Sequence, residues 1–374
     1  MMTKSHGQSG TKRSTLLEIV GMGMRTAVGS SAQQTYASLR AGISGIRELN
    51  WAKDRNVDPV LGGAVDYLTD EMQGVARLFV MAAPAMQEAF RQVLSTDEMA
   101  RSSRWAIFLL TGKWETNLKP PPLVSGTFCE AHLAKLQRQT GLPVDARWSL
   151  GTGGQAEIYF ALENAWNLID SGQVDYVMVG GVDSLLQFEV LYDLDLRLRL
   201  KTAYQSEGFI PGEAAAFLVF RAYKATFEKG SGTATIAGLG TALEKNTHDS
   251  DEPCFGEGLS KALRSTFRHH ESVIAELDGV VCDLDGERYR AKEWALSYSR
   301  ILGTCPGNPP LWCPAESIGN VGAALGPICL GWAAAALEKG YAPGPCLLIW
   351  GSSDQGQRGA VFMVDPVRFP VRRE

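Results

Sequence analysis

The sequence is poor in the residues that build metal sites and disulfide frameworks. It contains seven cysteines and five histidines in 374 residues, and none of the cysteines forms a C-x-x-C pair. The cysteine count is odd, and both Cys282 and Cys346 lie inside apolar runs. We therefore expect reduced thiols that pack as small core residues, and neither a metal nor another cofactor.

The sequence also lacks a long apolar run and an excess of basic charge. No run reaches the roughly 18 apolar residues of a membrane-spanning helix, and the formal net charge of -5 offers no basic field to nucleic acid. Residues 1–14 are polar, without the apolar core of a signal peptide, and predict a disordered tail. These absences favour a cytoplasmic protein that binds neither nucleic acid nor membrane.

The composition is otherwise that of an ordinary globular protein. Hydrophobic residues make up 45% of the chain and charged residues 21%. A chain of this length can bury a large core, either as two domains or as one internally duplicated unit.

The two halves of the chain resemble each other, which favours duplication. Short β-rich runs closed by glycine occur at 17–23 and 235–240, and longer apolar runs that end in glycine occur at 105–112 and 279–286. Glycine-rich residues followed by an apolar helix form a third pair, 150–171 and 318–339. Each of these helices is followed by two apolar strands, at 174–181 and 214–220 in one half and at 346–351 and 359–364 in the other.

Repeated strand–helix–strand units predict parallel sheets covered by helices, and hence an α/β protein. Chance similarity between two Rossmann-like βα repeats would predict the same class. The helical segments at 155–170 and 323–337 are apolar nearly all round, which places them in a shared central layer between two sheets. The expected division is a tail at 1–14, an N-terminal half at 15–230 and a C-terminal half at 231–374.

Four short motifs occur in a fixed order along the chain. They are LRAGISGI at 39–46, EGFIPGEA at 207–214, GEG at 256–258 and GNVGAA at 319–324. In this order they resemble motifs of the thiolase-fold condensing enzymes, in the β-ketoacyl synthase branch, over residues 16–364. The resemblance implies a thiolase-like fold, in which two duplicated βαβ halves form a layered α-β-α-β-α sandwich.

The resemblance also implies which positions would carry the chemistry. A decarboxylating condensation uses a cysteine thiolate at a helix N-terminus and two neutral donors that hold the thioester oxyanion. In this chain the cysteine position falls on Leu150, and the two donor positions fall on Asp285 and Asn320. Leucine cannot form a thioester, so we expect no catalytic residues at these degenerate positions.

The residues at the two donor positions differ in how well they could still stabilise an oxyanion. Asn320 retains an amide donor, whereas an ionised Asp285 would repel an oxyanion, and losing one donor costs on the order of 3–4 kcal/mol. Asp285 has an alternative role as a helix cap or as the partner of Arg288 or Arg290. The loop that gates the pocket in the family falls on residues 353–358, which have lost its phenylalanine and gained charge.

Three functions are open on these grounds. The first is a non-catalytic pseudoenzyme that acts through protein–protein contacts, as a homodimer, as a heterodimer with another thiolase-fold subunit, or as an accessory scaffold in bacterial secretion such as type VI effector loading. The second is an active acyltransferase or 3-oxoacyl synthase that uses Ser149 or a cysteine such as Cys313. The third is a module that binds an acyl chain or acyl carrier protein without reacting.

Overall fold

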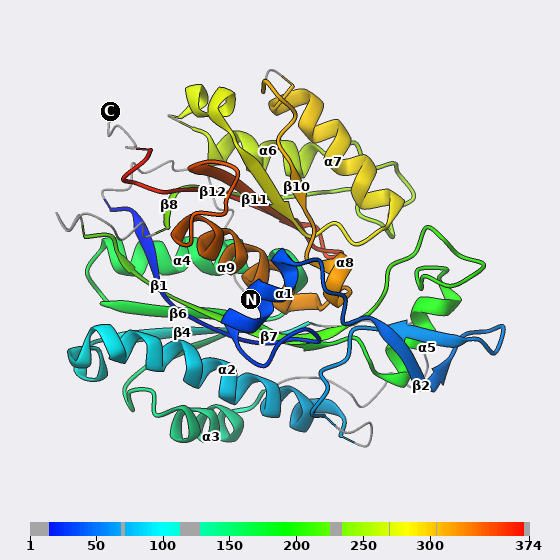
Figure 1. Cartoon of the computed structure of the whole chain (residues 1–374), viewed down its shortest axis with the longest axis horizontal. Coiled ribbons are helices and arrows are strands. Elements are labelled where there is room, and N and C mark those ends of the chain that lie inside the picture. Colours follow the sequence, from blue (N-terminus) through cyan, green and yellow to red (C-terminus); the bar gives the residue numbers. More distant parts are fainter. Residues whose placement is uncertain are drawn as a thin grey trace, which may run out of the picture.

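The computed structural model describes residues 15–68, 72–112, 128–224, 234–268, 270–303 and 305–369. The expected tail at 1–14 and the expected boundary between residues 230 and 231 lie outside the described residues. The described chain forms a mixed α/β structure around a large sheet (Figure 1). None of its helices combines the length and apolar character needed to cross a membrane.

The strands are β1 (Leu17–Arg25), β2 (Arg47–Lys53), β3 (Pro59–Gly62), β4 (Trp105–Leu110), β5 (Arg147–Gly151), β6 (Tyr176–Ser184), β7 (Glu213–Ala222), β8 (Thr235–Leu243), β9 (Gly279–Cys282), β10 (Leu311–Trp312), β11 (Cys346–Ser352) and β12 (Gln357–Val364). The α-helices are α1 (Ala32–Arg40), α2 (Gly74–Thr96), α3 (Glu130–Thr140), α4 (Glu157–Asp170), α5 (Phe188–Leu196), α6 (Glu257–Thr266), α7 (Arg288–Ile301), α8 (Ala315–Ile318) and α9 (Leu325–Glu338). Short 3-10 helices are η1 (Glu98–Ser102), η2 (Gly154–Ala156), η3 (Glu271–Glu276) and η4 (Gly322–Ala324).

The strand order confirms the predicted duplication. The main sheet runs β10-β9-β11-β12-β8-β1-β7-β6-β4-β5, and β1 and β8 join its two halves through a short antiparallel contact. From β1 outward the pairings are antiparallel, antiparallel, parallel and parallel. From β8 outward the same four pairings recur in the same order. The segments predicted to be equivalent therefore occupy equivalent strands.

The layers match the predicted α-β-α-β-α sandwich. Figure 1 shows α6 and α7 above the second half-sheet, α4 and α9 in the middle, and α2 and α3 below the first half-sheet. Every residue of α9 except Glu338 is buried, which is the expected result for an apolar helix covered by a sheet on each side. The central layer is therefore where the two halves share their core.

Buried ionic contacts connect one of the sequence motifs to this core. Glu213, the glutamate of the motif at 207–214, is fully buried at the start of β7. Its carboxylate accepts hydrogen bonds from Arg77 of α2 at 2.5 and 2.6 Å and from the Ser184 hydroxyl at 2.8 Å. Because a carboxylate without partners would be costly to bury, this motif residue serves the fold.

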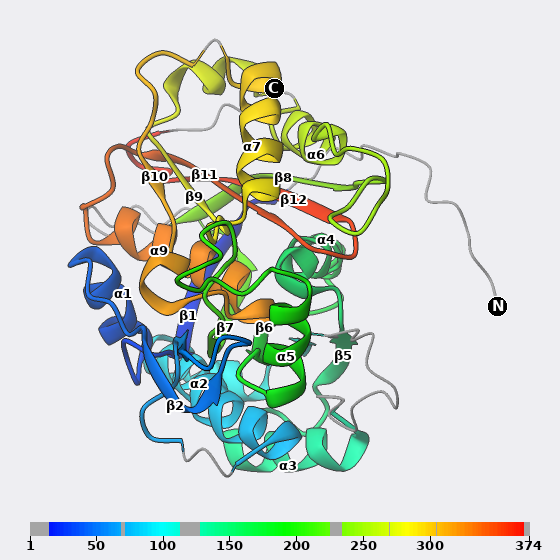
Figure 2. The ribbon, with the colours of Figure 1, turned by 90° about the vertical axis from the view of Figure 1, so that its right-hand side faces the viewer.

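Strand β5 is the last strand of the first half-sheet and pairs only with β4 among the described residues (Figure 2). The Thr111 amide donates to the Gly151 carbonyl, so Gly151, Ser149 and Arg147 direct their backbone groups toward β4. Trp148 and Leu150 alternate with them and direct their N–H and C=O groups to the outer edge. As far as the described residues extend, β5 therefore presents an unpaired strand edge.

Candidate functional site

The helical segment predicted at 155–170 is present as η2 and α4, but the residue at its tip is not the one that the resemblance assigned there. Leu150 lies in β5, opposite Leu109 of β4, and is 46% exposed. The chain then turns through Gly154, whose φ of 74° is in the left-handed region, into η2 and α4. The prediction that Leu150 stands at the helix tip is therefore wrong, because strand and turn continue past it before the helix starts.

Gln155 occupies the position at the helix tip. It is buried within η2, and its Nε2 donates to Oδ1 of Asn320 at 3.2 Å. The Asn320 Nδ2 in turn donates to Oδ2 of Asp285 at 2.7 Å. The structure thus brings together Asp285 and Asn320, as predicted, and adds Gln155, which the sequence reasoning missed.

A signal for Gln155 was present in the sequence. The repeat that pairs residue 150 with residue 318 also pairs Gln155 with Ala323, and both of these residues lie in the 3-10 turn that opens a central helix. Asn320 also receives the Gly322 amide on its Oδ1 at 3.0 Å, at the start of the equivalent turn in the second half. Aligning the two halves therefore places Gln155, and not Leu150, at the turn that opens a central helix.

Asp285 has the alternative role that the sequence suggested, with one of its two candidate partners. Its Oδ2 lies 3.4 Å from Nε of Arg290, and its Oδ1 accepts from the Glu287 amide at the start of α7. Arg288 points elsewhere: it is 80% exposed and lies 3.5 Å from Glu207. Burial raises the pKa of Asp285 to about 6, opposed by the charge of Arg290. Its oxygens face the Arg290 guanidinium and the N–H groups of Glu287 and Asn320, the surroundings that favour a carboxylate.

Further buried ion pairs surround the Asp285 carboxylate. Arg290 contacts Asp354 at 3.1 Å and donates to the Ser352 carbonyl at 2.5 Å. Arg199, which follows α5, pairs with Glu287 at 2.7 Å and with Asp354 at 2.8 Å. Burial opposes the ionisation of Asp354, but the two arginines outweigh it and hold the pKa of that carboxyl far below its usual range.

Asp354 belongs to the segment 353–358 that was predicted to correspond to the gating loop. In the structure this segment is the turn between β11 and β12 and the start of β12. The Ser353 hydroxyl accepts the amide of Ala156 at 2.8 Å, so the turn also caps the tip of the central helix. Two arginines and one helix end therefore hold the loop against the turn that opens α4.

The alternative nucleophiles lie outside this arrangement. Ser149 is an exposed residue of β5 opposite Phe108, and no hydrogen bond joins it to Asp285 or Asn320 in the described structure. The sulfur of Cys313 lies 3.6 Å from that of Cys282. Within the described part of the chain, no hydrogen bond joins either side chain to a histidine or carboxylate that could activate it.

A second buried carboxylate supports the other central helix. Asp183, at the end of β6, accepts the amides of Ala323 at 3.0 Å and Ser184 at 2.9 Å. A Cβ at Gly322 would lie 1.9 Å from the Asp183 carboxylate, so only glycine fits there. Burial raises the pKa of Asp183 from 3.8 to about 6, against the hydrogen bonds from these amides.

The raised pKa of Asp183 predicts a pH-dependent stability. Between pH 4 and pH 7 the folded chain binds this proton more tightly than the unfolded chain, so the stabilising contribution of the proton is lost as the pH rises. A change from 3.8 to about 6 corresponds to roughly 3 kcal/mol. For the wild type, we expect the free energy of unfolding in urea to fall between pH 4 and pH 7 as Asp183 loses its proton. Asp183→Asn should lack this part of the fall. Equal slopes for the two proteins would contradict the assignment.

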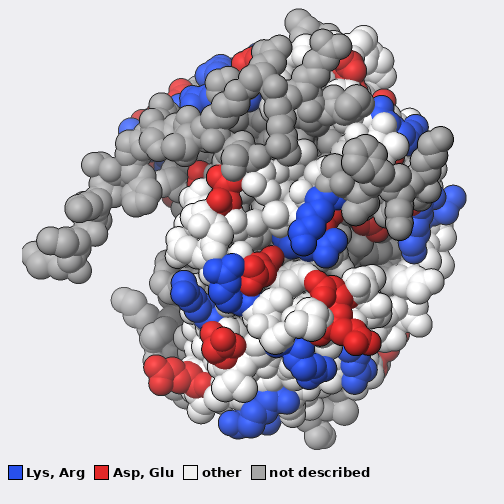
Figure 3. Space-filling view, turned by 90° about the vertical axis from the view of Figure 1, so that its left-hand side faces the viewer, with Lys and Arg blue, Asp and Glu red and all other residues white. Residues whose placement is uncertain are grey.

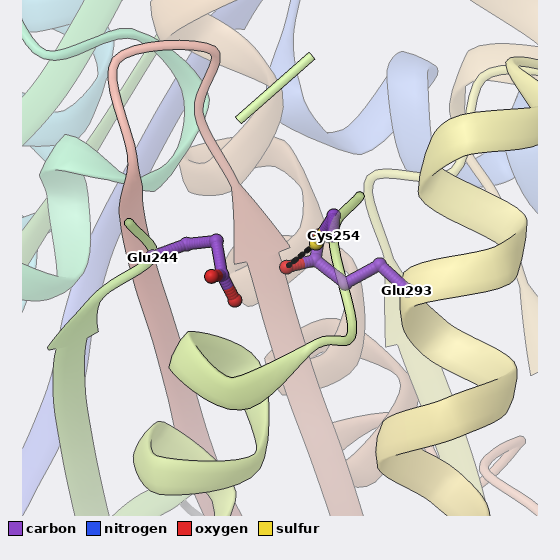
Figure 4. Close-up of side chains that lie close together, drawn as sticks. All are labelled: Glu244, Cys254 and Glu293. Atoms are coloured by element: carbon purple, nitrogen blue, oxygen red, sulfur yellow. Dashed lines mark hydrogen bonds between the residues drawn. The ribbon is translucent and has the colours of Figure 1, made fainter. Parts of the chain in front are cut away.

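One further cluster has the donor types of a metal site. Ligand atoms of Glu244, Cys254 and Glu293 lie within 4.8 Å of one another (Figure 4). Arg358 already donates to Glu293 at 2.6 Å, and the Gly258 amide donates to Glu244 at 2.7 Å. The guanidinium supplies the positive charge that these donors require, so the cluster does not fit a metal ion.

Comparison with known proteins identifies the fold. No family model and no curated protein sequence matches the chain. Among solved structures, it is similar to the ishigamide ketosynthase/chain length factor, with a TM-score of 0.75, 16% identity, and coverage of 94% of this chain and 99% of that one. It is also similar to a ketosynthase, ApeO, in complex with its chain length factor, ApeC, from Xenorhabdus doucetiae. That match has a TM-score of 0.73 and 15% identity, and it covers 94% of this chain and 98% of that one.

A third similar structure, the ketosynthase from module 6 of the bacillaene synthase of Bacillus subtilis 168, has a TM-score of 0.71 and 13% identity, over 94% of this chain and 72% of that one. All three similarities extend over nearly the whole of this chain. At these identities they establish the thiolase-like ketosynthase fold.

Proposed function

We propose that this chain is a non-catalytic member of the ketosynthase fold that acts by binding other proteins. The observation that carries the proposal is the Gln155 side chain at the tip of the buried helix, held by Asn320. An amide cannot form the thioester through which a condensing enzyme holds its acyl group. The position where a thiolate would be activated is occupied by a group with no comparable chemistry.

The surrounding residues support the same conclusion. An oxyanion site needs neutral donors that are free to point at the developing charge. The Asn320 amide is engaged by Asp285, and Asp285 itself brings negative charge to the site. The ion pairs of Arg199 and Arg290 with Asp354 then hold the covering loop in place. This arrangement stabilises the protein and occupies the Asn320 amide, the side-chain donor that the site retains.

The edge of β5 supports a partner that adds a strand. Trp148 and Leu150 direct backbone hydrogen-bonding groups outward, and the Leu150 side chain is 46% exposed. A strand from a second subunit can satisfy these groups by pairing with the edge. The solved relatives include a ketosynthase in complex with its chain length factor, so another thiolase-fold subunit is the partner that we propose.

Helix α5 supplies a further apolar surface. Phe188, Tyr192 and Leu196 recur at every fourth residue and are 65%, 47% and 54% exposed. The rings of Phe188 and Tyr192 stack at 6.2 Å, so the exposed side chains form one continuous stripe. Such a stripe is typical of a protein contact. On the face shown in Figure 3, by contrast, acidic and basic side chains are interspersed among the visible described residues.

The same surfaces would serve an accessory role. A scaffold in bacterial secretion, such as one that loads type VI effectors, would need binding surfaces and no active site. Acyl carrier protein is a second partner class, because one structural relative is described as an acyl-carrier protein in complex with its ketosynthase. Purification from the native host identifies which partner is retained.

The absence of acyl transfer is tested by intact mass spectrometry. We expect no mass increase after the purified chain is incubated with acyl-CoA or acyl carrier protein, because Gln155 has no nucleophilic atom. Gln155→Cys is the matched control: it places a thiol at the same tip, and alkylation of that thiol would show that reagents reach the site. A covalent acyl group on the wild-type chain, or carbon–carbon bond formation by it, would overturn the proposal.

The same samples test the non-covalent alternative. A chain that holds an acyl ligand without reacting would be stabilised by roughly 2.7 kcal/mol at a hundredfold excess over Kd. Unchanged thermal unfolding with acyl-CoA is the result that we expect, whereas stabilisation by acyl carrier protein without its acyl group would support a protein contact and not an acyl pocket.

A further inference from the structure

Two cysteines meet at the outer edge of the second half-sheet. Cys282 ends β9, and Cys313 directly follows β10. The parallel register pairs Val280 with Leu311 and Val281 with Trp312, so the two cysteines come next in register. Their sulfur atoms lie 3.6 Å apart. Among the cysteines of the described chain, all of which are free thiols, this is the one pair whose sulfur atoms are in contact.

The backbone geometry suits a covalent bond between them. Neighbouring strands in a sheet lie about 4.8 Å apart, and disulfides join Cα atoms separated by roughly 4.4–6.8 Å. Small rotations of the two side chains would therefore bring the sulfurs to bonding distance without separating the strands.

The two thiols differ in their access to solvent. Cys282 is fully buried beside Trp350 of β11, with which it is in register, and Trp350 stacks on Trp294 of α7. Burial, reinforced by contact with Cys313, raises the pKa of the Cys282 thiol well above its usual range. Cys313 is half-buried and is the member of the pair that reagents in solution can reach.

We propose that Cys282 and Cys313 are a modification site, at which a peroxide converts the two thiols into a disulfide. The Cys313 thiol loses its proton to solvent, the thiolate attacks one oxygen of hydrogen peroxide, and the O–O bond breaks, which leaves a sulfenic acid on Cys313 and a hydroxide that takes up a proton to become water. The Cys282 sulfur then attacks the sulfenic sulfur and displaces hydroxide, which leaves as water with the Cys282 proton. The two thiols lose two electrons in total, and the peroxide gains them.

The position of this bond connects it to the candidate site. Asp285 follows Cys282 by three residues, and Asn320 follows Cys313 across the short helix α8. A disulfide would tie together the two segments that carry the Asp285–Asn320 hydrogen bond. It would also close a long loop of chain, which stabilises a folded protein by restricting its unfolded state.

Peroxide treatment of the reduced, full-length chain tests the proposal. We expect the intact mass to fall by two hydrogens, the seven free thiols to become five, and peptide mapping to recover a Cys282–Cys313 cross-link. The melting temperature of the oxidised chain should rise by several degrees. Dithiothreitol should reverse all of these changes.

Two substitutions make the outcome specific. Cys313→Ser should abolish the loss of two hydrogens. Cys129→Ser, at an exposed cysteine distant in sequence from Cys282 and Cys313, should leave that loss unchanged. Cys282→Ser should leave Cys313 to accumulate added oxygen instead of a cross-link. Oxidation of the wild-type chain that yields no Cys282–Cys313 peptide, or a cross-link that forms only in denaturant, would overturn the proposal.

Discussion

Replacing Arg290 by methionine is expected to lower the free energy of unfolding by about 3–5 kcal/mol. Arg290 is buried, and its guanidinium lies within 3.4 Å of Asp283, Asp285 and Glu287 and 3.1 Å from Asp354. Methionine fills much of the same volume but leaves these carboxylates without their shared cation. Because whole domains are stable by only about 5–15 kcal/mol, the loss would be large. Urea unfolding monitored by circular dichroism measures it.

The neighbouring arginine provides the matched control. Arg288→Met, at an 80% exposed side chain on the same helix, should change the stability by less than about 0.5 kcal/mol. Adding Asp285→Asn to Arg290→Met should recover part of the loss, since one buried negative charge is then removed. If Arg290→Met were as stable as Arg288→Met, the ion-pair network would have no structural role.

Replacing Leu150 by proline is expected to weaken binding to the partner subunit at least tenfold. The Leu150 N–H faces the outer edge of β5, so proline removes a donor that an added strand would use while leaving the contacts with β4 in place. A tenfold change corresponds to about 1.4 kcal/mol, similar to a lost hydrogen bond together with local crowding. Analytical ultracentrifugation of the purified chain measures self-association, and co-purification from the native host measures binding to a different subunit.

Leu150→Ala separates the backbone effect from the side-chain effect, because it retains the N–H. We expect Leu150→Ala to bind more tightly than Leu150→Pro, and both variants to unfold at nearly the wild-type urea concentration. If the proline variant binds its partner as well as the wild type does, β5 is not the docking edge. A wild-type chain that neither self-associates nor retains a partner would contradict the binding role itself.

The architecture could be predicted from the sequence because it depends on repeated local patterns. Strands closed by glycine and apolar helices recur in the same order in both halves, and each pattern is set by residues close together in the chain. The central position of α9 follows from the same reasoning, since a helix with no polar face has to be covered on all sides. The resemblance also assigned Asp285 and Asn320 to one site, but the hydrogen bond between them was not predicted.

The residue at the helix tip could be decided only by the tertiary structure. Leu150 and Gln155 are five residues apart, and which of them faces Asn320 depends on where β5 ends and on the left-handed turn at Gly154. A shift of one residue along a strand reverses the direction in which a side chain points. A motif alignment alone therefore does not determine which residue lies at the helix tip.

The ion-pair network and the cysteine pair are also tertiary features. Arg199 and Asp354 are 155 positions apart, and Cys282 and Cys313 are 31 apart. Composition and spacing identified these residues as charged or apolar, but their contacts arise from how loops and strands meet after folding. The sequence by itself determined the layers and the repeat, because these depend on hydrophobic periodicity. The three-dimensional packing determined which polar groups fill the site, because hydrogen bonds and ion pairs depend on distances between residues that the chain order does not bring together.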